Sequence, residues 1–129
     1  AAERNNKRLF IVKQNRYNPP VLAVKKILDE NGLGKILSVQ MNCFWNRNED
    51  YFKDSWKGTN ELDGGILFTQ FSQFIDLLYL FFGEVDEVKS FYNNAIHTTS
   101  TEFADQCVAL LRFQTGALCA ANFTINSYE

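Results

Sequence analysis

The sequence predicts an α+β fold in which helices pack on one face of an open, mostly antiparallel sheet. Residues 37–45 alternate between apolar and polar side chains, which is the period of a strand with one buried face. Residues 107–113 and 117–125 read as two strands joined by a turn that contains Gly116, as in a β-hairpin. The predicted order is strand, helix, strand, helix and then three strands, and this order favours a layer of helices against a sheet.

Composition and charge narrow the possible functions. The chain has 129 residues, of which 46% are hydrophobic and 22% are charged, as expected for one domain with a core. Its formal net charge of −2 does not favour binding to nucleic acid or to an anionic membrane. Its three cysteines lack the spacing of a disulfide framework or a zinc site, so we expect buried thiols in a cytoplasmic protein and no bound metal.

The first third of the chain is predicted to run through a short strand into a helix. Residues 1–8 are polar and read as an exposed helix end, and residues 9–12 form an apolar run that predicts a buried strand. Asn18 is a candidate N-cap, Pro19 stands at the first helical position, and Gly32 follows the end of the helix.

The middle of the chain is predicted to contain a loop and a long apolar helix. Residues 46–62 are polar and aromatic, and they predict a loop. Residues 65–82 predict a helix that ends at Gly83, and this helix is too short and too polar to span a bilayer. Residues 85–96 then predict the first of the three final strands.

The long helix carries a polar stripe. At about 100° per residue, Thr69, Ser72, Gln73 and Asp76 fall on one narrow face, while nearly every other side chain is apolar. A solvated helix face would normally carry lysine and glutamate. Neutral hydrogen-bonding groups on a mostly buried helix suit a pocket for a hydroxylated ligand, but a satisfied polar seam against the sheet explains the same residues.

Two loops are further candidates for ligand contact, and each has a plainer explanation. Gly64 and Gly65 precede the helix, either as simple turn residues or as backbone that a ligand approaches closely. A dense polar run between the first predicted strand and the first helix is either a ligand-binding edge or a solvated loop. This run consists of Lys13, Gln14, Asn15, Arg16 and Tyr17.

The remaining candidates are a histidine and one sheet face. His97 is the only histidine and lies in a polar loop without an obvious base or carboxylate partner, so we expect an exposed loop residue. The polar face of residues 37–45, together with outward side chains of the last strand, forms a flat surface suited to pairing with another subunit. These outward residues are Leu118, Ala120, Asn122 and Thr124.

Several motifs together resemble the Gfo/Idh/MocA oxidoreductase family. No single motif is specific, but their order and spacing cover nearly the whole chain. The run from Lys13 to Pro19 is similar to that of the branch that oxidises UDP-linked N-acetyl-amino-sugar uronates at the 3-position for lipopolysaccharide and surface-polysaccharide synthesis. The matching stretches are residues 10–19 (FIVKQNRYNP), 32–36 (GLGKI), 45–47 (WNR), 51–52 (YF), 56–59 (WKGT), 63–65 (DGG), 70 (Q), 76–78 (DLL) and 113–117 (FQTGA).

The resemblance implies a two-domain enzyme of which this chain supplies one part. Family members, including glucose-fructose oxidoreductase-like enzymes, join an N-terminal Rossmann domain that binds NAD or NADP to a C-terminal domain whose open sheet makes dimers or tetramers. Residues 1–14 would then be the last helix and strand of an absent Rossmann domain. Residues 15–129 would be a substrate-binding and oligomerisation domain, truncated at its C-terminus. The expected substrate is a sugar or UDP-sugar, and the isolated chain is expected to be inactive and to hold no cofactor.

Two positions depart from the family pattern. In the family pattern, a Gly-Gly pair is followed after three residues by an Asp or Asn, and a His stands four residues later. The corresponding residues here are Gly64, Gly65, Thr69 and Gln73. The resemblance places Thr69 and Gln73 at the reacting sugar. A glutamine can orient a hydroxyl group but cannot act as a general base near neutral pH. Proton removal would then fall to the lysine of the family's Glu-Lys-Pro segment, which does not occur in this chain.

The polar run supplies the remaining expected contacts. Lys13 and Arg16 would hold anionic groups such as a uronate or a phosphate, and Gln14, Asn15 and Tyr17 are candidates for sugar or cofactor contact. The main hypothesis is a sugar or sugar-nucleotide dehydrogenase that transfers hydride between a CH–OH carbon and NAD(P). The alternative is a non-catalytic binding or assembly homologue on the same scaffold, which the glutamine at the histidine position also fits.

Overall fold

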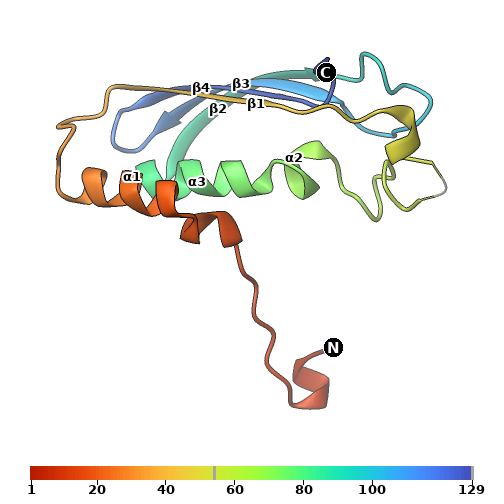
Figure 1. The fold of residues 1–129 in the computed structure, drawn as a ribbon, viewed down its shortest axis with the longest axis horizontal. Coiled ribbons are helices and arrows are strands. Elements are labelled where there is room, and N and C mark those ends of the chain that lie inside the picture. The colour runs from red at the N-terminus through yellow and green to blue at the C-terminus, as the bar shows by residue number, and fades with distance from the viewer. Residues whose placement is uncertain (54, 129) are drawn as a thin grey trace.

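The chain folds into two layers, with an open sheet on one side and the helices on the other (Figure 1). This computed structural model describes residues 1–53 and 55–128, and its first residues extend away from both layers (Figure 1). The helices are α1 (Pro19–Asp29), α2 (Ile66–Thr69) and α3 (Ser72–Phe82), with 3-10 turns η1 (Glu3–Asn5), η2 (Gln14–Tyr17) and η3 (Glu49–Tyr51). The strands are β1 (Ser38–Phe44), β2 (Val85–Asn93), β3 (Gln106–Phe113) and β4 (Leu118–Thr124).

The strands form one mixed sheet in the order β1-β4-β3-β2. β2, β3 and β4 are antiparallel neighbours, and β1 runs parallel to β4. In the β3–β4 turn, the backbone N–H of Gly116 donates to the carbonyl of Phe113 at 2.8 Å, and Gly116 has a φ of 86°, which glycine adopts without strain. The predicted fold class and the predicted hairpin are therefore confirmed.

Alternating side chains place the core between the sheet and the helices. On β4, Cys119, Ala121 and Phe123 are buried, while the residues between them face outward. β1 shows the predicted alternation, with Cys43 buried beside Phe123 in register. Phe71, from the segment between α2 and α3, is fully buried in the same core. The helices thus cover one face of the sheet and leave its other face open to solvent.

The cysteines match the expectation of buried thiols. Cys43, Cys107 and Cys119 are all buried and unpaired. Burial raises the pKa of the Cys43 thiol to about 11, so this thiol stays protonated near neutral pH. Within residues 1–53 and 55–128, no group of three or more histidine, cysteine or acidic residues is placed to hold a metal ion. The same part of the chain contains no helix long and apolar enough to cross a membrane.

The predicted strand over residues 9–12 is wrong. These four residues have irregular backbone and are between 62% and 82% exposed. A strand needs a neighbour for its backbone hydrogen bonds, and none of the described strands lies beside this segment. Residues 1–8 were predicted to be the exposed end of a helix, and the structure has only the 3-10 turn η1 among them.

The long apolar helix predicted before Gly83 is two helices. Between α2 and α3, the N–H groups of Gln70 and Phe71 both donate to the carbonyl of Ile66, at 3.1 and 2.8 Å. This wide turn brings Phe71 into the core, where its ring centroid lies 5.0 Å from that of Trp45 and 5.4 Å from that of Phe123. Aromatic packing on the sheet therefore accompanies a break that the apolar pattern alone does not predict.

Candidate functional site

Two polar segments that the sequence singled out meet in the structure. The turn η2 packs against α3, although the paired residues are 59 or 60 positions apart in the chain. Lys13 Nζ donates to Ser72 Oγ at 3.0 Å, and Gln73 Nε2 donates to Gln14 Oε1 at 2.8 Å. The polar stripe of the helix is thus turned toward the polar run rather than toward the sheet. The η2–α3 cluster consists of Lys13, Gln14, Arg16, Ser72, Gln73 and Asp76.

An ion pair between Arg16 and Asp76 is the strongest contact of the cluster. Arg16 donates from Nε to Asp76 Oδ2 at 2.6 Å and from Nη2 to Asp76 Oδ1 at 2.7 Å, so the guanidinium binds the carboxylate in bidentate geometry. The Arg16 side chain is 36% exposed and that of Asp76 is 15% exposed. The hydrogen bonds from Arg16 lower the pKa of Asp76, and the same carboxylate raises the pKa of Arg16.

The cluster can bind a polar ligand but offers no free base. Lys13 and Arg16 outnumber the one carboxylate, so the cluster carries excess positive charge that suits a carboxylate or phosphate group. Gln73 Oε1 is buried and has no hydrogen-bond partner among the described residues. Because Gln73 cannot take a proton and Asp76 is held ionised by Arg16, this arrangement supports binding rather than proton transfer.

Two residues of the polar run lie in η2 but outside the cluster. Asn15 accepts a long hydrogen bond from the side chain of Asn18, at 3.5 Å, and Tyr17 is 69% exposed. In residues 1–53 and 55–128, neither side chain hydrogen-bonds to α3. Their predicted contact with sugar or cofactor remains a prediction.

Thr69 also lies outside the cluster. Its hydroxyl group donates to the carboxylate of the buried Asp63, which accepts a second hydrogen bond from the backbone N–H of Gly58 at 2.9 Å. Gly64 and Gly65 have φ values of 75° and 99°, so the turn requires glycine at both positions. The structure thus supports the interpretation of the glycine pair as turn residues, and it gives Thr69 and Gln73 different hydrogen-bond partners.

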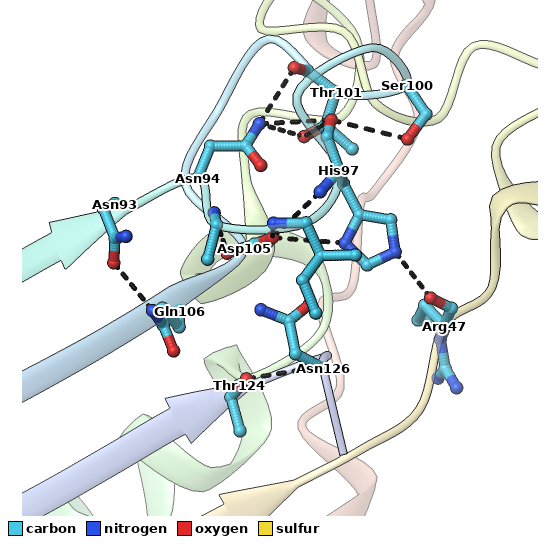
Figure 2. A network of polar contacts seen from close by, with 12 residues as sticks. Arg47, Asn93, Asn94, His97, Ser100, Thr101, Asp105, Gln106, Thr124 and Asn126 are labelled. Atoms are coloured by element: carbon cyan, nitrogen blue, oxygen red, sulfur yellow. Dashed lines mark hydrogen bonds and ion pairs between the residues drawn. The ribbon is translucent and has the colours of Figure 1, made fainter. Parts of the chain in front are cut away.

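The prediction that His97 is an exposed residue without a carboxylate partner is wrong. His97 is 3% exposed, and its Nδ1 lies 3.3 Å from Oδ2 of Asp105, which is fully buried. Its Nε2 lies 2.7 Å from the carbonyl oxygen of Arg47, 50 positions earlier in the chain (Figure 2). The contact with Arg47 depends on folding, so the polar loop around His97 gives no sign of it.

Asp105 anchors the loop between β2 and β3. Its carboxylate accepts backbone N–H groups from Ala95, Ile96 and His97 at 3.0, 2.8 and 3.1 Å. These bonds bend the chain after Asn93, which is why β2 ends there and not at the predicted Ile96. Burial alone would raise the pKa of Asp105, but the three N–H donors outweigh burial and lower it to about 2.

A second polar group surrounds Arg47, and the sequence analysis assigned its residues no role in the site. Its guanidinium carbon lies 4.8 Å from the ring centroid of Trp45 and 4.9 Å from that of Tyr51. Arg47 Nε donates to Oε1 of the buried Gln70 at 3.1 Å, and Lys57 Nζ lies 3.9 Å from the centroid of the Tyr51 ring. The sequence signals were the aromatic and cationic residues of the predicted loop over residues 46–62 and the family-like stretches 45–47, 51–52, 56–59 and 70.

Comparison with known proteins places the chain in a family. The GFO/IDH/MocA C-terminal domain matches residues 21–129. The chain belongs to the GFO/IDH/MocA family. A curated relative, Oxidoreductase P35 of Formosa agariphila, is 29% identical over 93 residues, which cover 69% of this chain and 29% of the relative. The resemblance seen in the sequence motifs is thereby confirmed.

Two dehydrogenases of known structure are similar to this GFO/IDH/MocA domain. WlbA of Bordetella pertussis, in complex with NADH and UDP-GlcNAcA, is 35% identical with a TM-score of 0.89, over 98% of this chain and 38% of its own. WlbA of Chromobacterium violaceum, in complex with the same two ligands, is 33% identical with a TM-score of 0.86, over 98% of this chain and 36% of its own. The chain thus spans less than two fifths of either WlbA structure.

The described residues do not fit a nicotinamide dinucleotide by themselves. Dinucleotides bind at the carboxyl ends of parallel strands, where a glycine-rich loop opens a helix. The sheet here is mostly antiparallel, and the helix that follows the glycine pair, α2, has only four residues. Residues 1–53 and 55–128 therefore do not form a complete dinucleotide-binding site by themselves, and we assign no hydride transfer to them.

Proposed function

We propose that this domain is the substrate-binding part of an NAD(P)-dependent dehydrogenase that oxidises a nucleotide-linked sugar uronate at a CH–OH carbon. The observation that carries the proposal is the η2–α3 cluster, which joins excess positive charge to neutral hydrogen-bonding groups on a partly exposed surface. The 35% identity to a WlbA dehydrogenase across 98% of the chain supports the same substrate class. In isolation the domain is proposed to be inactive.

Lys13 and Gln73 of the cluster, and two further residues of η2, have proposed tasks in holding the sugar. The Lys13 ammonium group donates to the Ser72 hydroxyl and has no other partner among the described residues. It is proposed to pair with a carboxylate or phosphate of the ligand. Gln73 Nε2, which donates to Gln14 Oε1 here, is proposed to hydrogen-bond the reacting sugar hydroxyl. Asn15 and Tyr17 lie in the same turn and are proposed to contact the sugar or the cofactor from its exposed side.

Thr69 and the glycine pair have weaker proposed tasks. The Thr69 hydroxyl proton is directed at Asp63, so its oxygen can only accept a hydrogen bond from a sugar. Gly64 and Gly65 are proposed to let a ligand approach the backbone, although their positive φ values already explain them as turn residues. We therefore expect Gln73 to contribute more to substrate binding than Thr69.

The proton and hydride steps are proposed to depend on groups outside this domain. NAD or NADP, when bound, accepts the hydride. The sugar hydroxyl must also lose a proton, and Gln73 cannot accept it near neutral pH. The lysine that the family resemblance assigns to the cofactor domain is proposed as the acceptor. This chain then contributes orientation and exclusion of wrong substrates.

We also propose that the open face of the sheet pairs with a second copy of the protein, giving a dimer or tetramer. Val108, Leu110 and Leu118 lie at the centre of this face and are 51%, 58% and 54% exposed. Across β3 and β4, Val108 pairs with Asn122, Leu110 with Ala120 and Leu118 with Arg112. Replacing Leu110 with glutamate is expected to shift the mass in solution toward the monomer.

The alternative proposal is a binding or assembly homologue without catalysis. Gln73 favours it, because the family pattern has a histidine at that position and glutamine cannot serve as a base. The two proposals share the ligand and differ in turnover. Measuring both binding and turnover with one ligand therefore separates them.

The deciding experiment uses the complete protein that carries this domain. NADH or NADPH formation is measured with UDP-GlcNAcA and, as a matched control, with UDP-GlcNAc, which lacks the carboxylate. Turnover of the uronate alone supports the dehydrogenase, and replacing Lys13 with glutamine is expected to weaken uronate binding at least tenfold. Calorimetric binding without turnover supports the alternative. Absence of both binding and turnover across a panel of nucleotide sugars refutes both proposals.

A further inference from the structure

The turn η2 carries most of the proposed sugar contacts but has no apolar anchor. None of its residues is buried, and α1, which follows it directly, also contains no buried residue. The segment that precedes it, residues 9–12, is exposed and irregular. Among residues 1–53 and 55–128, few apolar contacts therefore fix the turn, and polar contacts to α3 hold its position.

The Arg16–Asp76 pair is the contact best suited to fix that position. Two parallel hydrogen bonds constrain both the distance and the plane of the guanidinium, whereas Lys13 and Gln14 each make a single bond to α3. Asp76 lies on α3 and packs beneath the turn, with only 15% of its side chain exposed. A ligand would meet Lys13 and Gln73 more readily than this carboxylate.

The pairing also changes the role expected for Arg16. Its charge is balanced by Asp76, so Lys13 is the cation of the cluster that has no carboxylate partner among the described residues. We infer that Asp76 is a positioning residue that acts through Arg16 to hold η2 on α3 and so places Lys13 and Gln14 beside Gln73. This inference rests on the proposed function for its effect on substrate, while the positioning itself can be measured without substrate.

Hydrogen exchange measures the positioning directly. The N–H of Arg16 donates to the carbonyl of Lys13 at 3.1 Å, and the N–H of Asn18 donates to that of Asn15 at 3.2 Å, so these two amides report whether η2 is formed. Asp76→Asn is expected to raise their exchange rates at least tenfold. Asp29→Asn is the matched control, because it removes the exposed ion pair with Lys25 on α1 and leaves η2 untouched.

Steady-state kinetics of the complete enzyme test the consequence for substrate. Asp76→Asn is expected to raise KM for the uronate at least tenfold and to change kcat less than twofold, while Asp76→Glu, which keeps the charge, recovers most of the affinity. If Asp76 acts only through Arg16, then adding Asp76→Asn to an Arg16→Met variant changes KM less than twofold.

The outcomes separate this inference from the proposed function. Unchanged amide exchange in Asp76→Asn, or an equal rise in KM whether or not Arg16 is present, overturns the positioning role. If the complete protein neither binds nor oxidises any nucleotide sugar, the proposed function fails. In that case the exchange rates of the Arg16 and Asn18 amides alone decide whether the carboxylate holds the turn.

Discussion

Replacing Asp105 with asparagine is expected to destabilise the domain by about 2 kcal/mol near neutral pH. Folding lowers the pKa of this carboxyl group from 3.8 to about 2, and each unit of difference corresponds to roughly 1.4 kcal/mol. Asparagine keeps the shape but brings an amide NH₂ group among backbone N–H donors that need acceptors. Asp105 is 0% exposed, so the backbone N–H groups that lose their acceptor cannot hydrogen-bond to water instead.

The pH dependence follows from the direction of the pKa change. Because the folded-state pKa is below the unfolded value of 3.8, the ionised carboxylate contributes its full stability above that value. The contribution is lost as the pH falls toward the folded-state pKa of about 2. The wild type and Asp105→Asn should therefore differ most near neutral pH, differ by about half as much near pH 3, and become nearly equally stable only at about pH 2 or below.

Urea unfolding at neutral pH and at about pH 3 measures both effects as a free energy of unfolding. The matched control is Asp29→Asn, whose side chain is 59% exposed and whose loss is expected to cost less than about 0.5 kcal/mol. The reasoning is refuted if Asp105→Asn costs no more than this control near neutral pH. It is also refuted if the difference between wild type and Asp105→Asn does not shrink in acid.

Three further predictions concern a turn, a thiol and the cluster. Gly58→Ala is expected to lower the free energy of unfolding, measured in urea, by at least about 2 kcal/mol more than Gly116→Ala. Both glycines have a φ of 86°, but an added methyl group overlaps a carbonyl oxygen, that of Ser100, only at Gly58. Equal losses would contradict this. Cys43, with a pKa of about 11, should react with iodoacetamide at least a hundredfold more slowly in the folded chain than in urea at the same pH, and equal rates would show that it is accessible. Gln73→His in the complete enzyme should raise kcat and make kcat depend on pH near about pH 6.5, because the histidine can accept a proton. If kcat stays unchanged across this pH range, the histidine does not act as a base at this position.

Local sequence signals predicted the elements whose causes are local. The period-two alternation of residues 37–45 gave β1, because a strand next to a core must alternate its side chains. The glycine turn gave the β3–β4 hairpin, since Gly116 needs a positive φ. Residues 9–12 carry an equally good strand signal, yet they are irregular. A strand also needs a neighbour, and no local pattern shows whether one is present.

Contacts between distant residues set the features that the sequence did not predict. His97 pairs with a carboxylate eight positions later and with a carbonyl 50 positions earlier, and its neighbours in the sequence are the hydroxyl and amide groups of an ordinary polar loop. The polar stripe of the helix was visible from periodicity, but its partner was not. That partner, η2, precedes the stripe by about 60 positions, so no local pattern in the sequence relates η2 to the stripe.

The separation of Thr69 from Gln73 shows how one local break alters a predicted site. On a continuous helix, residues four apart lie on the same face, and the two would meet one ligand together. The wide turn that brings Phe71 into the core ends α2 at Thr69 and starts a new helix at Ser72. Thr69 then bonds to Asp63, while Gln73 faces η2. The same break thus places Phe71 in the core and gives Thr69 and Gln73 different partners, which the apolar pattern of the sequence does not predict.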